Sequence, residues 1–228
     1  SGLLFARGQK NISITGFGTI DGQGGNKTFQ FGNDADGGPK RPKIIYFVEC
    51  KGIVVTDVTL RNSAYWVQHY EKCEDVTIRG LKVFSHCNYN NDGLDIDAKN
   101  ATISDCYIDV EDDAICFKSD HPEFCENITV TNCVTASNCN AIKFGTASHG
   151  GYRNIAVSNC VVRRAAEDNI RHWSKQLEHI SADVTVISGV AIEMVDGGII
   201  DGITVSNISM RDVQTPIFIR LGDRHRTY

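Results

Sequence analysis

Acidic residues gather at two places in the sequence where short apolar segments begin. Asn90-Asn91-Asp92-Gly93-Leu94-Asp95 opens one such segment, and Glu111-Asp112-Asp113 precedes the next. Carboxylates held close together repel each other, which raises the pKa of at least one of them and lets it act as a proton donor. Cleavage of a glycosidic bond with inversion uses one protonated carboxyl and one carboxylate that activates water. Asp92, Asp112 and Asp113 are therefore candidate catalytic residues.

The same acidic residues allow two other interpretations. Calcium prefers carboxylate and carbonyl oxygens, and the run Asp92-Gly93-Leu94-Asp95-Ile96-Asp97 superficially resembles a calcium loop. However, this run lacks the spacing and the terminal glutamate of an EF-hand, and it reads as a strand. The aspartates could also simply cap turns. We prefer the glycosidase interpretation and expect neither a metal nor a cofactor.

A repeat in the sequence predicts the fold that would bring these aspartates together. A turn residue followed by a short alternating strand recurs at Asn11, Gly52, Asp75, Asn100, Asn127, Asn154, Asp183 and Gly202. Irregular spacing of this kind is typical of a solenoid whose loops differ in length. Helical periodicity between the strands is missing, which argues against a TIM barrel or a doubly wound sheet. We predict an all-β, right-handed, single-stranded parallel β-helix that forms one catalytic domain over residues 1–228.

A second apolar strand in each unit predicts which side chains face inward. The predicted core pairs are Leu94/Ile96, Ile115/Phe117, Ile142/Phe144, Ile192/Met194 and Ile217/Ile219. The residues between them should form an outward ladder of Asp95, Cys116, Lys143, Arg171, Glu193 and Phe218. The same register puts Asp92 and Asp113 in one column on rungs about 4.8 Å apart. A ladder alone would suit a solvated face with weak ion pairs, but beside the aspartates it indicates a ligand site.

The composition excludes several classes of protein. Apolar residues make up 41% of the 228 residues, which is enough for a continuous core and excludes a disordered chain. The formal net charge of −5 argues against a nucleic-acid partner. The sequence shows neither a membrane-spanning apolar run nor a signal peptide. We expect a monomer that binds neither nucleic acid nor membrane.

Nine cysteines raise the question of zinc or disulfides. Their number is odd, and no Cys-x-x-Cys pair accompanies a histidine cluster, so zinc is not expected. Several follow Ser-Asn or Thr-Asn, where a small buried thiol fits as well as a disulfide. We favour buried thiols, and disulfides remain the alternative.

Four motifs, in this order along nearly the whole chain, resemble one known family. Gly18-Thr19-Ile20-Asp21-Gly22-Gln23-Gly24 is similar to its Gly-x-Ile-Asp-Gly-x-Gly, and Asn62-Ser63-Ala64-Tyr65-Trp66 to its Asn-Ser-Pro-x-Trp. Asn90-Asn91-Asp92-Gly93 resembles Asn-Thr-Asp-Gly, and Asp112-Asp113-Ala114-Ile115-Cys116-Phe117-Lys118-Ser119 resembles its Asp-Asp element. The family is glycoside hydrolase family 28, the polygalacturonase-like enzymes on a right-handed parallel β-helix.

The resemblance implies roles for individual residues. Asp112 would be the general acid, while Asp92 and Asp113 would hold and activate the water. The substrate would be a pectic, galacturonate-containing polysaccharide, whose carboxylates call for basic groups near the acid pair. The expected substrate-binding residues are Asn90, Asn140, Lys143 and Arg171. The resemblance also implies a secreted or periplasmic enzyme of cell-wall carbohydrate degradation.

The sequence departs from the family pattern at two places. Cys139-Asn140-Ala141 stands where the family carries Gly-His-Gly, and we interpret the later His149 as a loop residue that does not replace the histidine. Arg171-His172-Trp173 stands where Arg-Ile-Lys is usual, so Lys143 would take over recognition of the sugar carboxylate. His69 could approach the cleft, although a surface histidine is the preferred interpretation.

Family members are longer than this chain, and neither end shows a capping unit, so we expect a fragment that is incomplete at both ends. Two rival functions stay open at this stage. A polysaccharide lyase on a similar solenoid would use calcium and a basic residue. A carbohydrate-binding solenoid without catalysis would explain the missing histidine.

Overall fold

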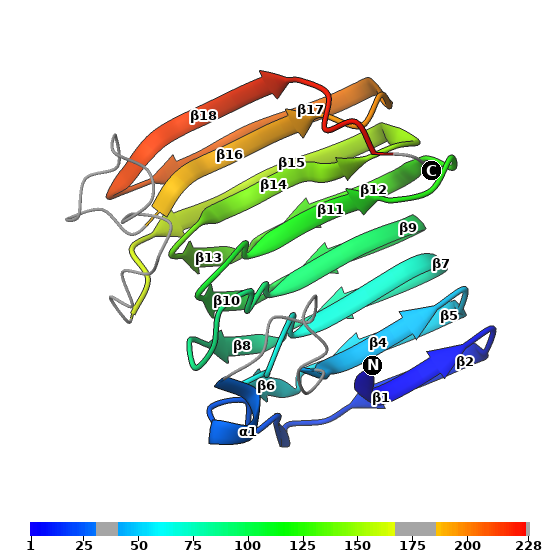
Figure 1. The fold of residues 1–228 in the computed structure, drawn as a ribbon, viewed down its shortest axis with the longest axis vertical. Helices are drawn as coiled ribbons and strands as arrows, with labels where there is room; N and C mark the ends of the chain where they lie inside the picture. Colours follow the sequence, from blue (N-terminus) through cyan, green and yellow to red (C-terminus); the bar gives the residue numbers. More distant parts are fainter. Residues whose placement is uncertain (31–40, 167–185, 227–228) are drawn as a thin grey trace.

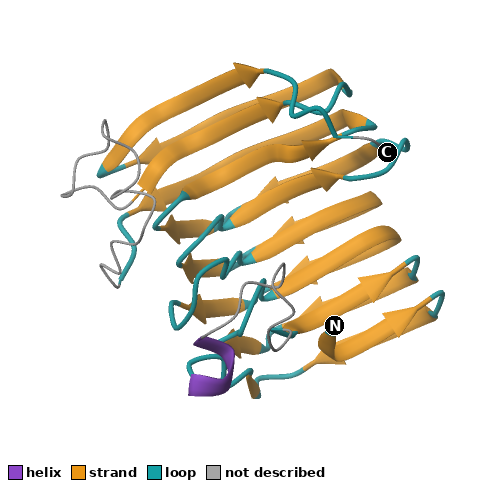
Figure 2. Ribbon diagram, viewed as in Figure 1, coloured by secondary structure: helices purple, strands orange, loops and turns teal. Residues whose placement is uncertain are grey.

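A computed structural model of the protein describes residues 1–30, 41–166 and 186–226. Those residues contain a single one-turn helix, α1 (Lys27–Gln30), and eighteen strands (Figure 2). The strands are β1 (Gly2–Arg7), β2 (Lys10–Thr15), β3 (Thr19–Asp21), β4 (Lys43–Val48), β5 (Lys51–Thr56), β6 (Thr59–Arg61), β7 (Gln68–Arg79), β8 (Lys82–Ser85), β9 (Leu94–Ser104), β10 (Tyr107–Val110), β11 (Ile115–Ser119), β12 (Cys125–Thr131), β13 (Val134–Ser137), β14 (Asn140–Ser148), β15 (Gly151–Arg163), β16 (Val186–Met194), β17 (Ile199–Met210) and β18 (Val213–Leu221).

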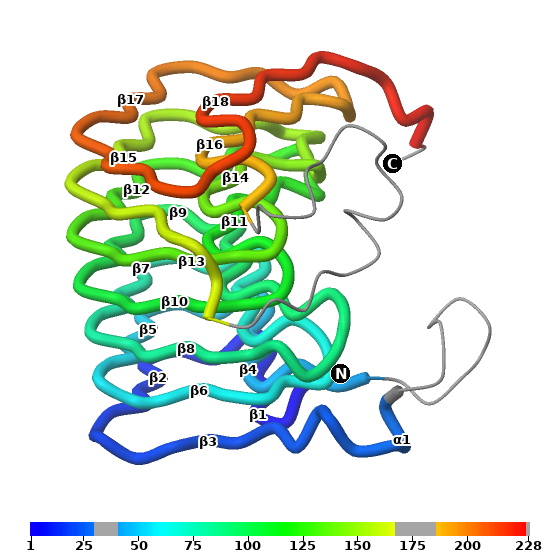
Figure 3. Tube along the Cα trace, turned by 90° about the vertical axis from the view of Figure 1, so that its left-hand side faces the viewer, coloured from blue at the N-terminus to red at the C-terminus, as the bar shows by residue number. Residues whose placement is uncertain are grey.

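Successive coils of the chain stack on one another, and all of the strand pairings are parallel (Figures 1 and 3). Three faces run the length of the stack. The first, which we call the site face, contains β1, β4, the start of β7 and of β9, β11, β14, β16 and β18. The second follows β2, β5 and β12, and the third follows β3, β6, β8, β10 and β13. The predicted right-handed parallel β-helix is confirmed.

Alternation of side chains along each strand builds the core. Leu94, Ile115 and Ile142 stack as one inward column on the site face, and all three are fully buried. Phe117 and Phe144 continue the next column, with their rings stacked at 4.5 Å between centroids. Successive side chains of a strand point to opposite faces, so the intervening residues point away from the core. This is how the sequence directs its polar side chains to the surface of the site face.

The register of β16 differs from the prediction. Val190 pairs with Ile142 and Ile192 pairs with Phe144, so the core pair of this strand is Val190/Ile192 and not Ile192/Met194. The outward residue on this rung is therefore Ala191 and not Glu193, which pairs with Arg220 instead. A shift of two residues keeps every side chain on its own face, so the sequence pattern alone does not distinguish the two registers.

The turn residues of the repeat adopt left-handed backbone conformations. Asn100, Asn127 and Asn154 have φ angles of 58°, 58° and 52°. Asparagine, aspartate and glycine reach this region more readily than other residues, which explains why these types recur at the turn. The asparagines also bond along the stack, because Asn127 Nδ2 donates to Asn100 Oδ1 at 3.1 Å and Asn154 Nδ2 to Asn127 Oδ1 at 2.8 Å.

One predicted repeat does not form a unit of its own. The coil that starts at Asn154 stacks directly on the coil that starts at Gly202, because Ile155 pairs with Ile203. Asp183 itself lies outside the described residues, and the strand that follows it, β16, belongs to the site face. The segment Gln23–Lys43, which we call the insertion, contains helix α1 in its described part.

None of the nine cysteines, all of which lie in described residues, forms a disulfide. Cys106, Cys133 and Cys160 occupy the same position in successive coils and are buried. Eight of the nine thiols are buried, and Cys87 is partly exposed. In the described part of the chain, no helix has the length and apolar character that crossing a membrane requires.

Candidate active site

The candidate catalytic aspartates lie where the third face turns into the site face. Leu94 pairs with Ile115, which places Asp92 and Asp113 at equivalent positions of successive coils. Backbone bonds tie these positions together, since Gly93 N donates to Asp113 O at 2.8 Å and Ala114 N donates to Asn140 O at 2.9 Å. The carboxyl-bearing residues Asp92, Asp112 and Asp113 are only 3%, 5% and 2% exposed. Three acidic groups are thus held in one nearly dry site.

Asp113 is surrounded by donors. Its Oδ1 accepts hydrogen bonds from Asn140 Nδ2 at 2.7 Å and Asn140 N at 3.3 Å, and its Oδ2 accepts one from Lys143 Nζ at 3.0 Å. Burial on its own would raise the pKa of Asp113, but the ammonium groups of Lys143 and Lys118 and these hydrogen bonds outweigh it and lower the pKa. Asp113 is therefore the carboxyl of the site that stays ionised.

Asp112 differs from its neighbour although both are equally buried. Its Oδ1 accepts a hydrogen bond from the Asp113 backbone N at 2.8 Å, and its Oδ2 accepts one from Asn90 Nδ2 at 3.4 Å. Burial and the negative charge of Asp113 raise the pKa of Asp112, against the weaker opposing pull of Lys143. Asp112 is thus the better proton donor of this adjacent pair.

Asp92 has a different partner, the buried ammonium of Lys118. Lys118 Nζ lies 3.2 Å from Asp95 Oδ1 and 3.9 Å from Asp92 Oδ2. Burial, with repulsion from Asp95 and Asp112, raises the pKa of Asp92 well above its usual value. Asp92 Oδ1 is buried and accepts no hydrogen bond from the described part of the chain. This oxygen therefore keeps an unused capacity to accept a hydrogen bond.

Asn140 occupies the place that the resemblance gives to a histidine. Instead of a titratable ring, its amide binds Asp113, as described above, and also donates to Cys139 Sγ at 3.2 Å. His149 follows strand β14, and its backbone N donates to Ser119 O at 2.7 Å. His149 lies between the end of β14 at Ser148 and the start of β15 at Gly151, in agreement with its interpretation as a loop residue.

One group of side chains in the described residues has the geometry to share a metal ion. Asp112, Asp113 and Cys139 each offer a ligand atom within 4.8 Å of the others. The oxygens of Asp113 already accept bonds from Asn140 and from the Lys143 ammonium, whose positive charge would oppose a cation. The donor set therefore favours proton chemistry over a metal.

Cations and aromatic rings form the wall of the site on the side of the earlier coils. Arg41, at the end of the insertion, packs over the Tyr65 ring at 4.5 Å and donates through Nη2 to Asn90 Oδ1 at 3.2 Å. Asn90 also donates to Asp112. The two hydrogen bonds in series, from Arg41 to Asn90 and from Asn90 to Asp112, orient the Asp112 carboxyl. Tyr65 stacks on Trp66 with 5.3 Å between ring centroids.

His69 is not the surface histidine that the sequence favoured. His69 is 5% exposed and lies on the outward ladder of the site face, between Tyr46 and Asp95. The rings of Tyr46 and His69 stack at 5.2 Å. Burial and the neighbouring ammonium of Lys43 lower the pKa of His69 well below its usual value, so this imidazole is neutral. The prediction of a surface histidine was wrong because the burial of His69 depends on the strand register, which the local sequence does not show.

The structure brings together five of the seven sequence-predicted catalytic and binding residues, in the coils that contain β9, β11 and β14: Asn90, Asp92, Asp112, Asp113 and Asn140. Lys143 joins them through its bond to Asp113. Arg171 and the neighbouring Trp173 lie outside the described residues.

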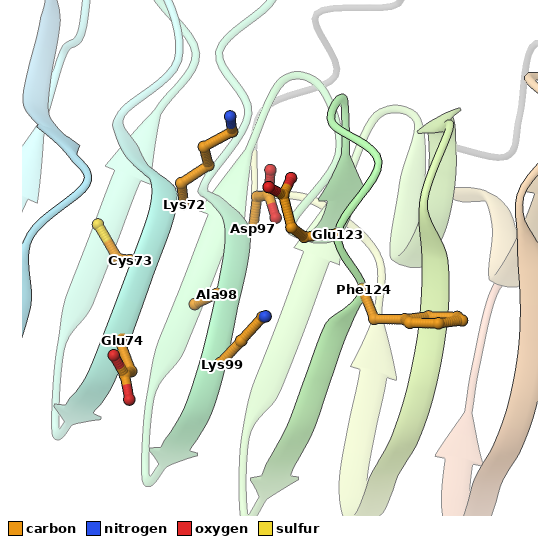
Figure 4. Close-up of a pocket in the computed structure, with 8 residues that line it drawn as sticks. All are labelled: Lys72, Cys73, Glu74, Asp97, Ala98, Lys99, Glu123 and Phe124. Atoms are coloured by element: carbon orange, nitrogen blue, oxygen red, sulfur yellow. The ribbon is translucent and has the colours of Figure 1, made fainter.

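A cavity of about 230 Å³ lies elsewhere, and none of the three candidate catalytic aspartates lines it (Figure 4). It opens between β7, β9 and the segment before β12, and Asp97 and Glu123 line it with Lys72. Burial, with repulsion from Asp120 and Glu71, raises the pKa of Asp97 to about 8. This carboxyl lies next to the site on strand β9 but faces a different space.

The profile of Glycosyl hydrolases family 28 matches residues 4–222. The chain belongs to this family. Among curated proteins, the "Probable polygalacturonase" of Vitis vinifera is 34% identical over 128 residues, which cover 54% of this chain and 25% of that protein. A polygalacturonase of Saccharomyces cerevisiae is 30% identical over 127 residues, 52% of this chain and 34% of the yeast protein. The match thus spans between a quarter and a third of these relatives.

Solved structures of family 28 share the fold of the chain. An exopolygalacturonase of Thermotoga maritima superposes with a TM-score of 0.70 at 21% identity, over 99% of this chain and 56% of that one. A family 28 exopolygalacturonase of Yersinia enterocolitica gives a TM-score of 0.69 at 18% identity, over 95% of this chain and 43% of that one. At these identities the likeness concerns the fold.

Sequence reasoning missed three cations in the site of this family 28 chain: Arg41, Lys43 and Lys118. A signal for Lys118 existed, because it follows the outward Cys116 by two residues and must share its face. Arg41 and Lys43 carried no such signal. They stand at the end of the insertion Gln23–Lys43, and the point where an insertion rejoins the coil depends on its path through space.

Proposed function

We propose that this chain carries the catalytic centre of an O-glycosyl hydrolase that cleaves a pectic, galacturonate-containing polysaccharide by single displacement with inversion. The observation that supports this most is the opposite shift of two adjacent, equally buried carboxyls. The pKa of Asp113 is lowered and that of Asp112 is raised, so one site holds a base and an acid at the same pH.

In the proposed reaction, Asp112 gives its proton to the leaving glycosidic oxygen as the bond from that oxygen to the anomeric carbon breaks. Asp113 accepts a proton from a water whose oxygen forms the new bond to the same carbon. Asp92 helps to hold this water through its unoccupied Oδ1. Because the pKa of Asp92 is raised, we assign the basic role to Asp113 and a positioning role to Asp92. No metal or cofactor takes part.

The stereochemical outcome needs its own test. The closest ligand oxygens of Asp112 and Asp113 lie within 4.8 Å of each other. In most inverting glycosidases the two carboxyl groups are about 6.5–9.5 Å apart. Inversion is therefore proposed from membership of the family and not from this spacing.

The names of the relatives support a polygalacturonan-type substrate, and the cationic wall of the site suits its carboxylates. We place the protein outside the cell, in the secreted or periplasmic compartment where such polymers occur, and we propose that it acts as a monomer. The rival functions, a lyase and a binding module, have no observation in their favour.

The test is a screen for new reducing ends with pectic polymers, followed by NMR of the anomeric configuration of the first product. We expect release by the unmodified chain, with inversion, and a loss of about 10²–10⁴-fold in kcat for Asp112→Asn. Asp201→Asn, on exposed strand β17, is the matched control and should keep full activity. Full activity of Asp112→Asn, a retained configuration, or an unsaturated product that absorbs in the ultraviolet would contradict the proposal.

A further inference from the structure

Three lysines line the site, and two of them are neutralised by the protein itself. Lys143 is paired with Asp113 at 3.0 Å and lies 3.8 Å from Glu193. Lys118 is paired with Asp95 at 3.2 Å. Neither ammonium has a charge left over for a ligand, because each lies between carboxylates.

Lys43 is the exception. Its Nζ donates to the ring nitrogen Nδ1 of His69 at 2.8 Å, and His69 is neutral, so this hydrogen bond supplies no negative charge to Lys43. Within the described part of the chain, no carboxylate lies at ion-pair distance from this ammonium. A charge removed from water is normally paired, and a missing counterion points to a ligand that supplies it.

Aromatic rings surround the same ammonium. Lys43 Nζ lies 4.1 Å from the centre of the Tyr46 ring and 4.4 Å from that of Trp66. Lys43, Tyr46 and Trp66 are only partly buried, so a ligand can reach them from solvent. Rings of this kind hold a cation in place and offer a flat apolar surface to a sugar.

The position of Lys43 relative to the aspartates follows from the register. Ile45 pairs with Gln68, and Val67 N donates to Asp92 O at 2.7 Å. Lys43, Trp66 and Asp92 therefore occupy equivalent positions of three successive coils. Two coils correspond to about 10 Å, so a chain of sugars that passes Asp92 can run over Trp66 to Lys43.

We propose that Lys43 binds a carboxylate of the substrate at a sugar position two coils before Asp92, with Trp66 as the surface on which the intervening sugar rests. This inference rests on the proposed function, because it takes the substrate to be a uronate polymer. Lys43, rather than the already paired Lys143, is then the residue that selects acidic over neutral sugars on this side of the site.

The protonation of Lys43 supports the same assignment. Burial lowers the pKa of Lys43 to about 8, although the charges of Asp95, Glu71 and Asp92 act in the opposite direction. The other groups that face it are Lys118, His69 and Tyr46. A bound carboxylate would raise this pKa, so affinity for acidic sugars should fall as the pH rises from 7 to 9.

The experiment measures binding, separately from turnover. Calorimetry is carried out on Asp112→Asn with galacturonate oligomers and with the same oligomers after methyl esterification. We expect Lys43→Met in this background to bind the acidic oligomer at least tenfold more weakly and the ester nearly as before. Lys43→Arg, which keeps the charge, should bind within about threefold of the parent and lose the decline between pH 7 and 9. Lys82→Met, on strand β8 of the third face, should change nothing.

The outcomes separate the two proposals. Unchanged binding by Lys43→Met, equal weakening for acid and ester, or no binding of the acidic oligomer by the parent would overturn the role of Lys43. Tight binding that depends on Lys43, without turnover by the unmodified chain, would support that role and overturn the hydrolase. If Lys43→Met does not fold, the test is the affinity for the acidic oligomer between pH 7 and 9, compared between the parent and Lys43→Arg. An equal fall of this affinity in both proteins would overturn the inference.

Discussion

At the scale of single residues, the placement of cations decides which carboxyl holds a proton. Asp112 and Asp113 are neighbours in sequence and equally buried, so burial alone would raise both pKa values. Asp113 differs because Lys143 and Asn140 both bind its carboxylate. Among the described residues, the Asp112 carboxyl accepts hydrogen bonds from the Asn90 amide and from one backbone N–H. An acid and a base can therefore stand side by side.

Replacement of Lys143 by methionine removes the nearest positive charge from Asp113. The pKa of Asp113, which this charge holds down, should rise, so the base becomes protonated at a higher pH. We expect the acidic limb of the pH profile of kcat/KM to move upward by about one pH unit or more, with kcat reduced on its acidic side. Lys143→Arg is the control and should leave the limb in place. An unmoved limb in Lys143→Met would show that Asp113 is not the base.

At the scale of elements, the turns keep the strands in register. The second face begins in each coil with a left-handed residue, and asparagine ladders bond these turns along the stack. These turns also fix the register of the strands on the site face, because a strand can slide along its neighbour only if the asparagine bonds of its turn break. The turn residues thus act on the site from the other end of the site-face part of each strand, as Asn100 does in β9.

Asn127→Ala should destabilise the protein for two separate reasons. Alanine disfavours the φ of 58°, at a cost of about 1–2 kcal/mol, and it removes the two ladder bonds to Asn100 and Asn154. We expect the free energy of unfolding to fall by about 1–3 kcal/mol in urea titrations. Asn127→Gly loses the ladder but accepts the backbone conformation, so it should be less destabilised. A glycine variant as unstable as the alanine variant would refute the strain argument.

At the scale of the whole molecule, one apolar core runs through the coils from β4 to β16, and the site lies on its outside. Asp113 and Phe117 belong to the same short segment, one outside and one inside. Stability of a solenoid comes from the contacts of each coil with its two neighbours. A defect inside one coil therefore weakens the support of the aspartates in that coil and in the next.

Phe117→Ala tests this dependence. The ring is fully buried and stacks on Phe144, so its loss should cost about 3–5 kcal/mol of unfolding free energy in a denaturant titration. Val161→Ala, at a 42% exposed position of β15, is the matched control and should stay within about 0.5 kcal/mol. Equal effects of the two substitutions would mean that the core is not the source of stability.

The sequence by itself determined the β-helix, the inward and outward faces of β9, β11 and β14, and the common column of Asp92 and Asp113. These follow from a period of two along each strand and from the equal distance of the two aspartates from Leu94 and Ile115, which pair. No long-range information was needed, because neighbouring coils repeat the same local pattern.

Only the tertiary structure decided the register of β16, the burial of His69 and the partners of the three lysines. A strand can shift by two residues without turning any side chain to the other face, so Glu193 and Ala191 were equivalent candidates for the ladder. Lys43 and Lys118 have the same charge in the sequence. Lys118 is paired with Asp95, whereas Lys43 is bonded to the neutral imidazole of His69. This difference depends on distances between coils, which the linear order of residues does not contain.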